Sequence, residues 1–279
     1  MILKVIMLVV FFAIMIGVGF YSRKQATDVN GFVLGGRSVG PWLTAFAYGT
    51  SYFSAVIFVG YAGQFGWKYG IASTWIGIGN AVLGSLIAWA VLGKRTRLIT
   101  QKLDSRTMPE FFERRYSSKS LKLVSSLIIF VFLIPYTASL YNGLSRLFGM
   151  AFEIDYKVCV IAMAALTGIY VIVGGYMATA INDFIQGIIM LFGIVVVIAA
   201  VLKNYGGLTG ALDKLANVSD PAVSSTPGVF ASFLGPDIFN LVCVVILTSL
   251  GTWGLPQMVQ KFYAIKDEKS IRTGTVVST

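Results

Sequence analysis

The chain has 279 residues, of which 56% are apolar and 12% charged, and its formal net charge is +10. Soluble domains carry about 25% charged residues, and a chain of this length cannot wrap the apolar core that this composition would need. The apolar residues come in runs of roughly 20, each long enough to cross a bilayer as a helix. The composition therefore indicates an all-α polytopic membrane protein and excludes secreted, cytosolic-enzyme and disordered classes.

The chain contains no histidine. This excludes Ser-His-Asp and Cys-His catalysis and most catalytic zinc sites. Its basic residues lie in short loops, where they set membrane orientation and do not indicate nucleic-acid binding. We therefore expect neither an enzyme nor a nucleic-acid-binding protein.

Hydropathy predicts seven membrane-spanning segments. We interpret the first as a retained helix, because its apolar run is longer than that of a signal peptide and lacks a cleavage site. Two short helices are expected in the loops, one opened by Pro109 and ending near Arg115, the other from Leu208 to Leu215. The seven segments are roughly 3–22, 41–64, 70–93, 121–149, 157–177, 183–203 and 238–262.

Lysine and arginine predict the orientation in the plasma membrane. The stretches 23–37, 94–122 and 261–272 hold three, nine and four of the 22 basic residues. Alternate loops fall on the same side, so these three stretches share one face. Because basic loops stay in the cytoplasm, we expect the N-terminus outside and the C-terminus in the cytoplasm.

Two segments carry glycine and hydroxyl residues near their midpoints. The segment 41–64 has them at 48–54, and the segment 238–262 has them at 248–252, followed by Pro256. An unsatisfied backbone group in hydrocarbon costs several kcal/mol, so such residues need protein or a water-filled cavity around them. Close helix packing is the alternative explanation for one such helix. Two at matching depth favour a binding site.

These two segments lie five helices apart and enter the membrane from opposite sides. That layout is typical of an inverted repeat of five helices in which each repeat opens with a discontinuous helix. Residues 1–40 would be an extra helix and cytoplasmic loop, 41–203 the first repeat, and 204–237 an extracellular loop. Residues 238–279 would be the first helix of the second repeat with a cytoplasmic tail. The remaining helices would be absent, which predicts a truncated chain that needs its C-terminal half or a partner chain.

Three motifs resemble the sodium:solute symporter family, and the sodium/proline symporter branch within it. The first is Gly-Gly-Arg-Ser-Val-Gly-Pro at 35–41. The second is Gly-Gly-Tyr-Met-Ala at 174–178 followed by Asn-Asp-Phe-Ile-Gln at 182–186. The third is Gly-Leu-Pro-Gln at 254–257 with Lys-Phe-Tyr-Ala-Ile-Lys-Asp at 261–267. The resemblance covers nearly the whole chain and implies a LeuT-like fold with one extra N-terminal helix.

The resemblance also implies a Na⁺ site where the segment 41–64 unwinds. The backbone carbonyls of Thr50 and Phe53 would contact the ion, and Asp183 would attract and release it. Asp183 as the N-cap of a helix is the alternative. Arg37 would serve a cytoplasmic gate, with a plain positive-inside anchor as the alternative.

A solute cavity would lie between the segments 41–64, 121–149 and 238–262. For each aromatic residue expected in this cavity, the alternative is that it faces lipid or packs in the core. Two features depart from the proline carriers, which have Asp in place of Tyr52 and aromatic residues in place of Thr248 and Thr252. The expected solute-binding residues are Ser51, Tyr52, Ser54, Tyr136, Asn142, Thr248, Thr252, Trp253 and Pro256.

The function implied is Na⁺-coupled symport of a small organic solute by alternating access, with proline or another amino acid as the first candidate. A sugar or a carboxylate such as pantothenate is the alternative solute. A solute-sensing membrane module, or a truncated product without activity of its own, is the alternative of another class.

Overall fold

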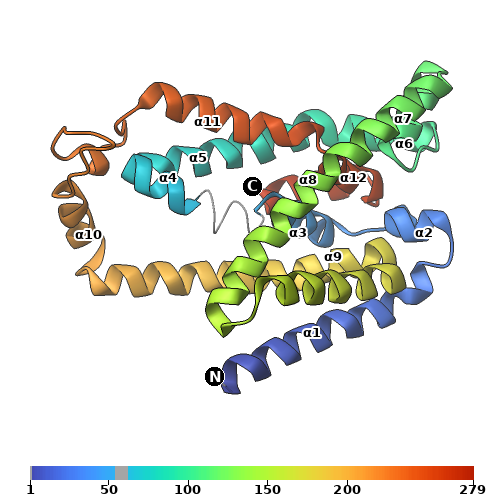
Figure 1. Ribbon diagram of the computed structural model, residues 1–279. Coiled ribbons are helices and arrows are strands. Elements are labelled where there is room, and N and C mark those ends of the chain that lie inside the picture. The colour runs from blue at the N-terminus through green and yellow to red at the C-terminus, as the bar shows by residue number, and fades with distance from the viewer. Residues whose placement is uncertain (1, 54–61) are drawn as a thin grey trace.

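The computed structural model of the chain describes residues 2–53 and 62–279 (Figure 1). These residues form helices and connecting loops, and the described ranges contain no strand beyond two isolated bridges, Val39 with Ile265 and Asp220 with Ser224. The expected all-α class is therefore confirmed. The candidate residue Ser54 lies outside the described residues.

Thirteen α-helices are labelled in the described part of the chain. Two π-helical stretches, Asn80–Ile87 and Trp89–Gly93, join α5 to α6. The helices are α1 (Ile2–Ser22), α2 (Val29–Leu34), α3 (Pro41–Tyr52), α4 (Ala62–Tyr69), α5 (Thr74–Gly79), α6 (Lys94–Lys102), α7 (Met108–Tyr116), α8 (Lys119–Phe152), α9 (Tyr156–Asn204), α10 (Gly207–Ala216), α11 (Ile238–Leu250), α12 (Pro256–Ala264) and α13 (Glu268–Ser278).

Four stretches of the described chain are long and apolar enough to cross a membrane. They are Ile2–Gln25, Ala62–Lys102, Lys119–Phe152 and Tyr156–Asn204. A fifth span is possible if Ile238–Gly254 and Pro256–Ala264, which bend by 53° at their junction, count as one. The chain is an integral membrane protein on this basis, while the number of seven spans and the LeuT-like arrangement stay predictions.

The helix α9 contains two of the predicted segments, separated at Gly175. That residue has φ 58° and ψ −150°, a conformation open to glycine, and a Cβ there would lie 2.9 Å from the Phe32 carbonyl oxygen. Both halves of α9 contact α1, since Gly174 lies against Gly19 and the Asn182 amide donates to the Met15 carbonyl at 3.4 Å. The chain therefore doubles back at Gly175, just before the connection expected between the segments 157–177 and 183–203, as Figure 1 shows.

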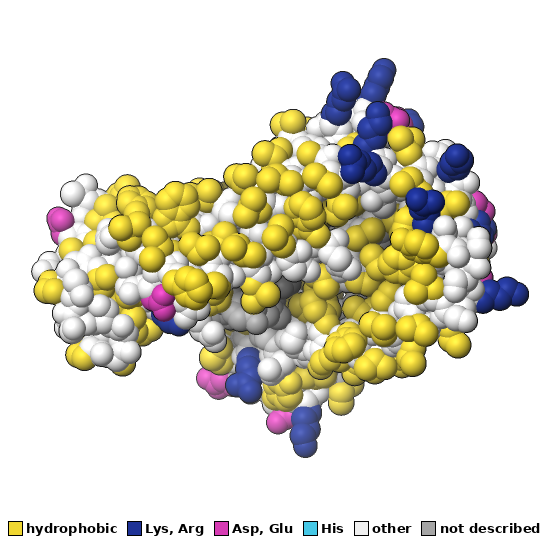
Figure 2. Space-filling model, turned by 90° about the horizontal axis from the view of Figure 1, so that it is seen from above, with side chains coloured by type: hydrophobic (Ala, Val, Ile, Leu, Met, Phe, Trp, Pro, Cys, Tyr) yellow, Lys and Arg dark blue, Asp and Glu magenta, His cyan; other side chains and the backbone are white. Residues whose placement is uncertain are grey.

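The three stretches predicted to share one membrane face meet at one end of the molecule. The Arg97 Nε donates to the Ile265 carbonyl at 2.6 Å, and the Lys266 N–H donates to the Val39 carbonyl at 2.9 Å. Figure 2 shows lysine and arginine side chains gathered at the end where α6 and α7 lie in Figure 1. The shared face is thus supported by contacts, and its assignment to the cytoplasm stays a prediction.

Candidate functional site

The helix α3 ends halfway along its predicted segment. The Thr50 hydroxyl donates back to the Phe46 carbonyl at 2.9 Å, a local bond that weakens a helix. Phe53 has non-helical angles, φ −90° and ψ 64°, and its N–H closes the last turn onto Gly49 at 2.8 Å. A helix end exposes the carbonyls of its last turn to other ligands, which is the chemistry expected of Thr50 and Phe53.

The second predicted break is also present. The helix α11 ends at Leu250, a 3₁₀ turn covers Gly251–Gly254, and α12 begins at Pro256 after an extended Leu255. Proline suits a first helical position because it has no N–H to leave unpaired. The chain bends by 53° here. Each unusual segment therefore contains a real break at its glycine and hydroxyl residues.

The two breaks are joined by four residues that we call the Tyr52 cluster: Tyr52, Asn80, Thr248 and Ser249. The Tyr52 hydroxyl lies 2.7 Å from Asn80 Oδ1 and 3.0 Å from the Thr248 carbonyl oxygen. The Ser249 hydroxyl donates to the same Asn80 Oδ1 at 3.0 Å. Tyr52, Asn80 and Ser249 are buried. The hydroxyl of one broken helix thus reaches the backbone of the other inside the protein.

The residues around the Tyr52 cluster hold it in place. Asn80 begins the π-helical stretch, a feature that often marks functional sites. A Cβ on Gly84 would collide with the Tyr52 hydroxyl, so this position requires glycine. Trp253 follows the α11 break and donates from Nε1 to the Leu83 carbonyl at 3.0 Å. The π-helix therefore fixes both breaks from one side.

A second group, the Asp183 cluster, consists of Thr50, Tyr176, Asp183 and Lys261. The Lys261 Nζ lies 3.5 Å from Asp183 Oδ2, with side chains 8% and 24% exposed. The same Nζ lies 5.2 Å from the centre of the Tyr176 ring, and the Thr50 side chain interacts with the Asp183 carboxylate. These contacts bring together the break of α3, the second half of α9 and α12.

Asp183 does not begin a helix. Helical geometry resumes directly after Gly175, so Asp183 lies about two turns inside the second half of α9. The N-cap interpretation is therefore wrong, because the first-turn N–H groups that a cap would satisfy lie near Tyr176. The carboxylate instead faces Lys261 across the interface with α12.

Arg37 binds three backbone carbonyls from separate elements. Its two terminal nitrogens lie 2.6 Å from the Ser105 oxygen, 3.3 Å from the Thr100 oxygen and 3.5 Å from the Tyr263 oxygen. It holds φ 56°, which is uncommon for a residue other than glycine. Burial and the neighbouring Arg97 lower the pKa of its guanidinium, which stays charged. Arg37 thus ties the loop before α3 to α6 and α12.

Two expected solute-binding residues lie apart from both clusters. Tyr136 and Asn142 are on α8, whose main partners are α7 and α9. The Asn142 side chain is exposed, and its Oδ1 accepts from Arg146 Nε at 2.9 Å and from the Tyr156 hydroxyl at 3.3 Å. Within the described residues no hydrogen bond joins either side chain to the two clusters, and their role in solute binding stays a prediction.

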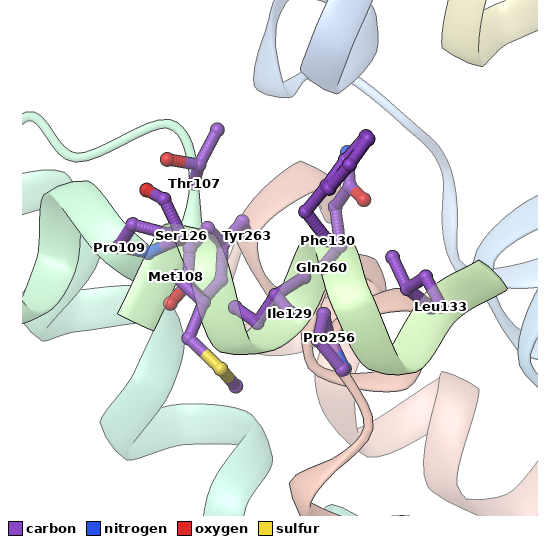
Figure 3. A pocket seen from close by; sticks show the side chains of 10 residues that line it. All are labelled: Thr107, Met108, Pro109, Ser126, Ile129, Phe130, Leu133, Pro256, Gln260 and Tyr263. Atoms are coloured by element: carbon purple, nitrogen blue, oxygen red, sulfur yellow. The ribbon is translucent and has the colours of Figure 1, made fainter. Parts of the chain in front are cut away.

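The other expected residues lie near the breaks. Ser51 is half-buried in the last turn of α3, and the Thr252 hydroxyl donates to the Ser249 carbonyl at 2.9 Å. Pro256 faces a cavity of about 410 Å³, together with Gln260 and Tyr263 of α12 (Figure 3). The start of α7 and one face of α8 complete its walls. Met258 and Phe262 instead pack on the Tyr52 side of α12.

Sequence reasoning missed Asn80, Ser249, Lys261 and Arg97 as members of these networks. Asn80 had a usable signal, because it is the one amide in the apolar run 75–93, and a polar side chain within a span marks function. Lys261 stands at the end of its predicted segment and was counted as a loop charge. Its partner is 78 residues away, beyond the reach of local patterns.

Comparison with known proteins gives consistent matches. A family model described as the sodium:solute symporter family matches residues 32–279. The osmoregulated proline transporter OpuE of Bacillus subtilis (strain 168) is 32% identical over 271 residues, covering 96% of this chain and 53% of that protein. The sodium/proline symporter of Staphylococcus aureus (strain JH9) is 36% identical over 270 residues, covering 95% and 51%. The chain thus spans about half the length of these curated relatives.

Proposed function

Because the chain belongs to the sodium:solute symporter family, we propose that it serves Na⁺-coupled symport of a small organic solute, with proline the first candidate. Membership confirms the resemblance that its three motifs carry and the exclusion of enzyme classes. Proline is the solute in the names of both relatives described above. The proposal covers the whole transporter, since the chain matches about half of each relative.

One observation carries the proposal: the ends of two broken helices meet at the Tyr52 cluster. The Tyr52 hydroxyl of α3 lies 3.0 Å from the Thr248 carbonyl of α11. Broken helices near the middle of a membrane expose backbone dipoles that bind the charged groups of a solute. This junction is flanked along the chain by Ser51, Thr252 and Trp253. Their hydroxyl and indole groups would contact a bound amino acid.

We assign the ion to the neighbouring Asp183 cluster. Na⁺ is a hard cation that prefers oxygen, and carbonyls of Thr50 and Phe53 with the Asp183 carboxylate supply such oxygens. Arg37 would hold the gate on the side of the basic end. With that end in the cytoplasm, the N-terminus lies outside and transport runs inward in the plasma membrane.

The energy available suffices for uptake by alternating access. One positive charge that crosses 100 mV gains about 2.3 kcal/mol. A tenfold Na⁺ gradient adds about 1.4 kcal/mol. Together they support accumulation of a neutral solute by several hundredfold. Ion binding would order the break of α3 and raise the affinity for solute.

The test is uptake of labelled solutes into proteoliposomes that contain the protein as purified from its source membrane. Its intact mass is recorded first, so that the transporting species is defined. We expect proline to accumulate under an inward Na⁺ gradient and not under an equal choline gradient. Equal accumulation under both gradients would contradict the proposal.

Other solutes and other functions are outcomes of the same assay. Preference for a sugar or for pantothenate over proline would keep the mechanism and change the solute. Na⁺-dependent binding without accumulation would identify a solute-sensing module. The Tyr52→Phe variant tests the site itself, since it removes the hydroxyl that joins the two breaks.

A further inference from the structure

We propose that Lys261 is a built-in competitor for the coupling cation. Its ammonium group neutralises Asp183 while no ion is bound there, and ion binding displaces it and loosens α12 from α9. The inference rests on the proposed function, because the cation concerned is the one coupled to symport.

The first argument is the charge balance of the Asp183 cluster. A carboxylate taken out of water needs a cationic partner, and Lys261 is the cation that the structure places beside Asp183. The site carries one negative charge, so Na⁺ and the ammonium together would leave an excess buried positive charge. The single carboxylate can therefore neutralise only one of the two cations.

The second argument is the looseness of the pair. Its N–O distance is 3.5 Å, whereas the surface pairs Lys94–Glu268 and Lys122–Glu113 have 2.8 and 2.7 Å. Charge-assisted hydrogen bonds are strongest at about 2.7–2.9 Å. The pair of Lys261 and Asp183 therefore lacks the tight contact of the two pairs whose lysines are exposed, so an incoming ion replaces a weaker interaction.

The third argument is that Lys261 has a second partner. Its Nζ lies 5.2 Å from the centre of the Tyr176 ring, within the range of a cation–π contact. This contact does not involve Asp183 and remains available when the carboxylate turns to an ion. Displacement of Lys261 from Asp183 therefore does not leave its charge without a stabilising neighbour.

The oxygens beside Asp183 suit a small cation. The Thr50 hydroxyl lies beside the Asp183 carboxylate and 2.9 Å from the Phe46 carbonyl oxygen, so it brings a further oxygen to the cluster. The Tyr176 hydroxyl is buried and has no hydrogen-bond partner among the described residues. A hard cation at the carboxylate would thus have the hydroxyl oxygens of Thr50 and Tyr176 within the same cluster.

The location of Lys261 links the ion to a moving part. It lies on α12, directly after the 53° break, whereas Asp183 lies on α9. Loss of the ion pair reduces the link between these two helices to the contact of Lys261 with the Tyr176 ring of α9. By reciprocity, whatever favours the release of α12 also favours cation binding at Asp183.

The test is the Na⁺ concentration that gives half-maximal thermal stabilisation of the purified protein, with choline holding ionic strength constant. Lys261→Met is compared with Lys269→Met, which removes an exposed lysine eight positions further along the chain. We expect Lys261→Met to lower that concentration about tenfold, within the usual range of coupling between sites. Lys269→Met should match the wild type.

Lys261→Arg extends the series in the other direction, because a guanidinium holds a carboxylate through two parallel hydrogen bonds. We expect this variant to need more Na⁺ than the wild type. Competition is supported if the Na⁺ concentration for half-maximal stabilisation rises from the Met variant to the wild-type Lys to the Arg variant. General damage to the fold would instead weaken Na⁺ binding in both variants. Unchanged or weaker Na⁺ binding in Lys261→Met overturns the proposal.

Asp183→Asn separates this inference from the proposed function. If it abolishes the Na⁺ response while Lys261→Met leaves it unchanged, the ion site stands and the competition falls. If Asp183→Asn keeps the wild-type Na⁺ response, the assignment of the ion to Asp183 falls as well. The double variant Asp183→Asn/Lys261→Met removes both charges of the Asp183 cluster. We expect it to fold and to show no thermal stabilisation by Na⁺.

Discussion

The Tyr52 cluster and the Asp183 cluster both join α3 to a second broken or kinked helix. They differ in charge and in how fully their polar groups are hydrogen-bonded. The Tyr52 cluster is neutral, and its hydroxyls reach acceptors at 2.7 to 3.0 Å. The Asp183 cluster holds an ion pair at 3.5 Å between the buried Lys261 and the half-buried Asp183, and a tyrosine hydroxyl without a partner in the described chain.

This difference assigns separate tasks to the two clusters. Well-paired neutral groups fix the geometry of a site, and a solute can exchange hydrogen bonds with them at modest cost. A charge that is partly removed from water and loosely paired is costly, so binding of a mobile cation stabilises it more than it would stabilise a well-paired neutral group. The first cluster therefore suits the solute and the second the ion. The predictions below test this division, beginning with the largest expected effect.

Asp183→Asn should abolish Na⁺-driven uptake. It removes the carboxylate and leaves Lys261 buried without a counter-charge, and breaking a buried pair in this way costs about 3–5 kcal/mol. Uptake and thermal stability are measured in Na⁺ and in choline. Asp213→Asn on α10 is the matched control, since Asp213 is exposed. Wild-type uptake by Asp183→Asn would return Asp183 to a structural role.

Tyr52→Phe should weaken solute binding and leave Na⁺ affinity nearly unchanged. It removes the hydroxyl from the half-buried Thr248 carbonyl and leaves Ser249 as the donor to Asn80 Oδ1, and losing such a bond costs about 1–3 kcal/mol. Tyr48→Phe is the control, because the Tyr48 hydroxyl donates to the buried Gly84 carbonyl at 2.9 Å and does not reach α11. Equal losses of solute affinity in both variants would show that the effect is structural.

Arg37→Lys should slow transport and lower stability without changing the affinity of either cluster. An ammonium group cannot reach three carbonyls in the directions that the guanidinium serves. We expect a loss of about 1–2 kcal/mol, seen as a lower midpoint of thermal unfolding. Arg23→Lys provides a control at an exposed site. A change in solute affinity with an unchanged transport rate would contradict a role at the gate.

The smallest effect is expected at the start of α13. The Ser270 backbone N–H donates to Asp267 Oδ1 at 2.8 Å and lowers the pKa of this carboxyl. Stabilisation by a lowered pKa is present above the ordinary carboxyl range and is lost as the pH falls through the lowered value. The protection of the Ser270 N–H from hydrogen exchange, relative to the intrinsic rate at the same pH, should therefore fall at acidic pH. Asp267→Ala should show fast exchange at neutral pH, and Asp267→Asn, which still caps, should not.

Much of the architecture was predictable because it follows from local chemistry. Apolar runs predicted long helices, the gap between the segments 157–177 and 183–203 predicted the reversal that α9 makes at Gly175, and Pro109 predicted the start of α7. Pro135 did not break α8, which continues from Lys119 to Phe152. The tail predicted after residue 262 contains α13, whose Gly274 packs against Trp89. That helix depends on long-range packing, which local patterns do not encode.

The candidate site was predicted only in part, for the same reason. Backbone breaks follow from glycine, proline and hydroxyl residues, so the positions of Tyr52 and Thr248 emerged from the sequence. Which side chains meet across the breaks depends on tertiary packing. Asn80 and Lys261 belong to the clusters through partners far along the chain. The expected role of Tyr136 and Asn142 on α8 stays a prediction, because neither side chain is hydrogen-bonded to a cluster in the described residues.

Equilibrium binding of labelled proline to the purified protein, titrated at low and at high Na⁺ with choline as the replacement, tests the division between the clusters most directly. We predict that Na⁺ raises the affinity for proline in the wild type. In Tyr52→Phe the affinity should fall at both Na⁺ concentrations and keep its Na⁺ dependence, and in Asp183→Asn that dependence should vanish. Proline affinity that ignores Na⁺ in the wild type, or loses its Na⁺ dependence in Tyr52→Phe, would contradict the account.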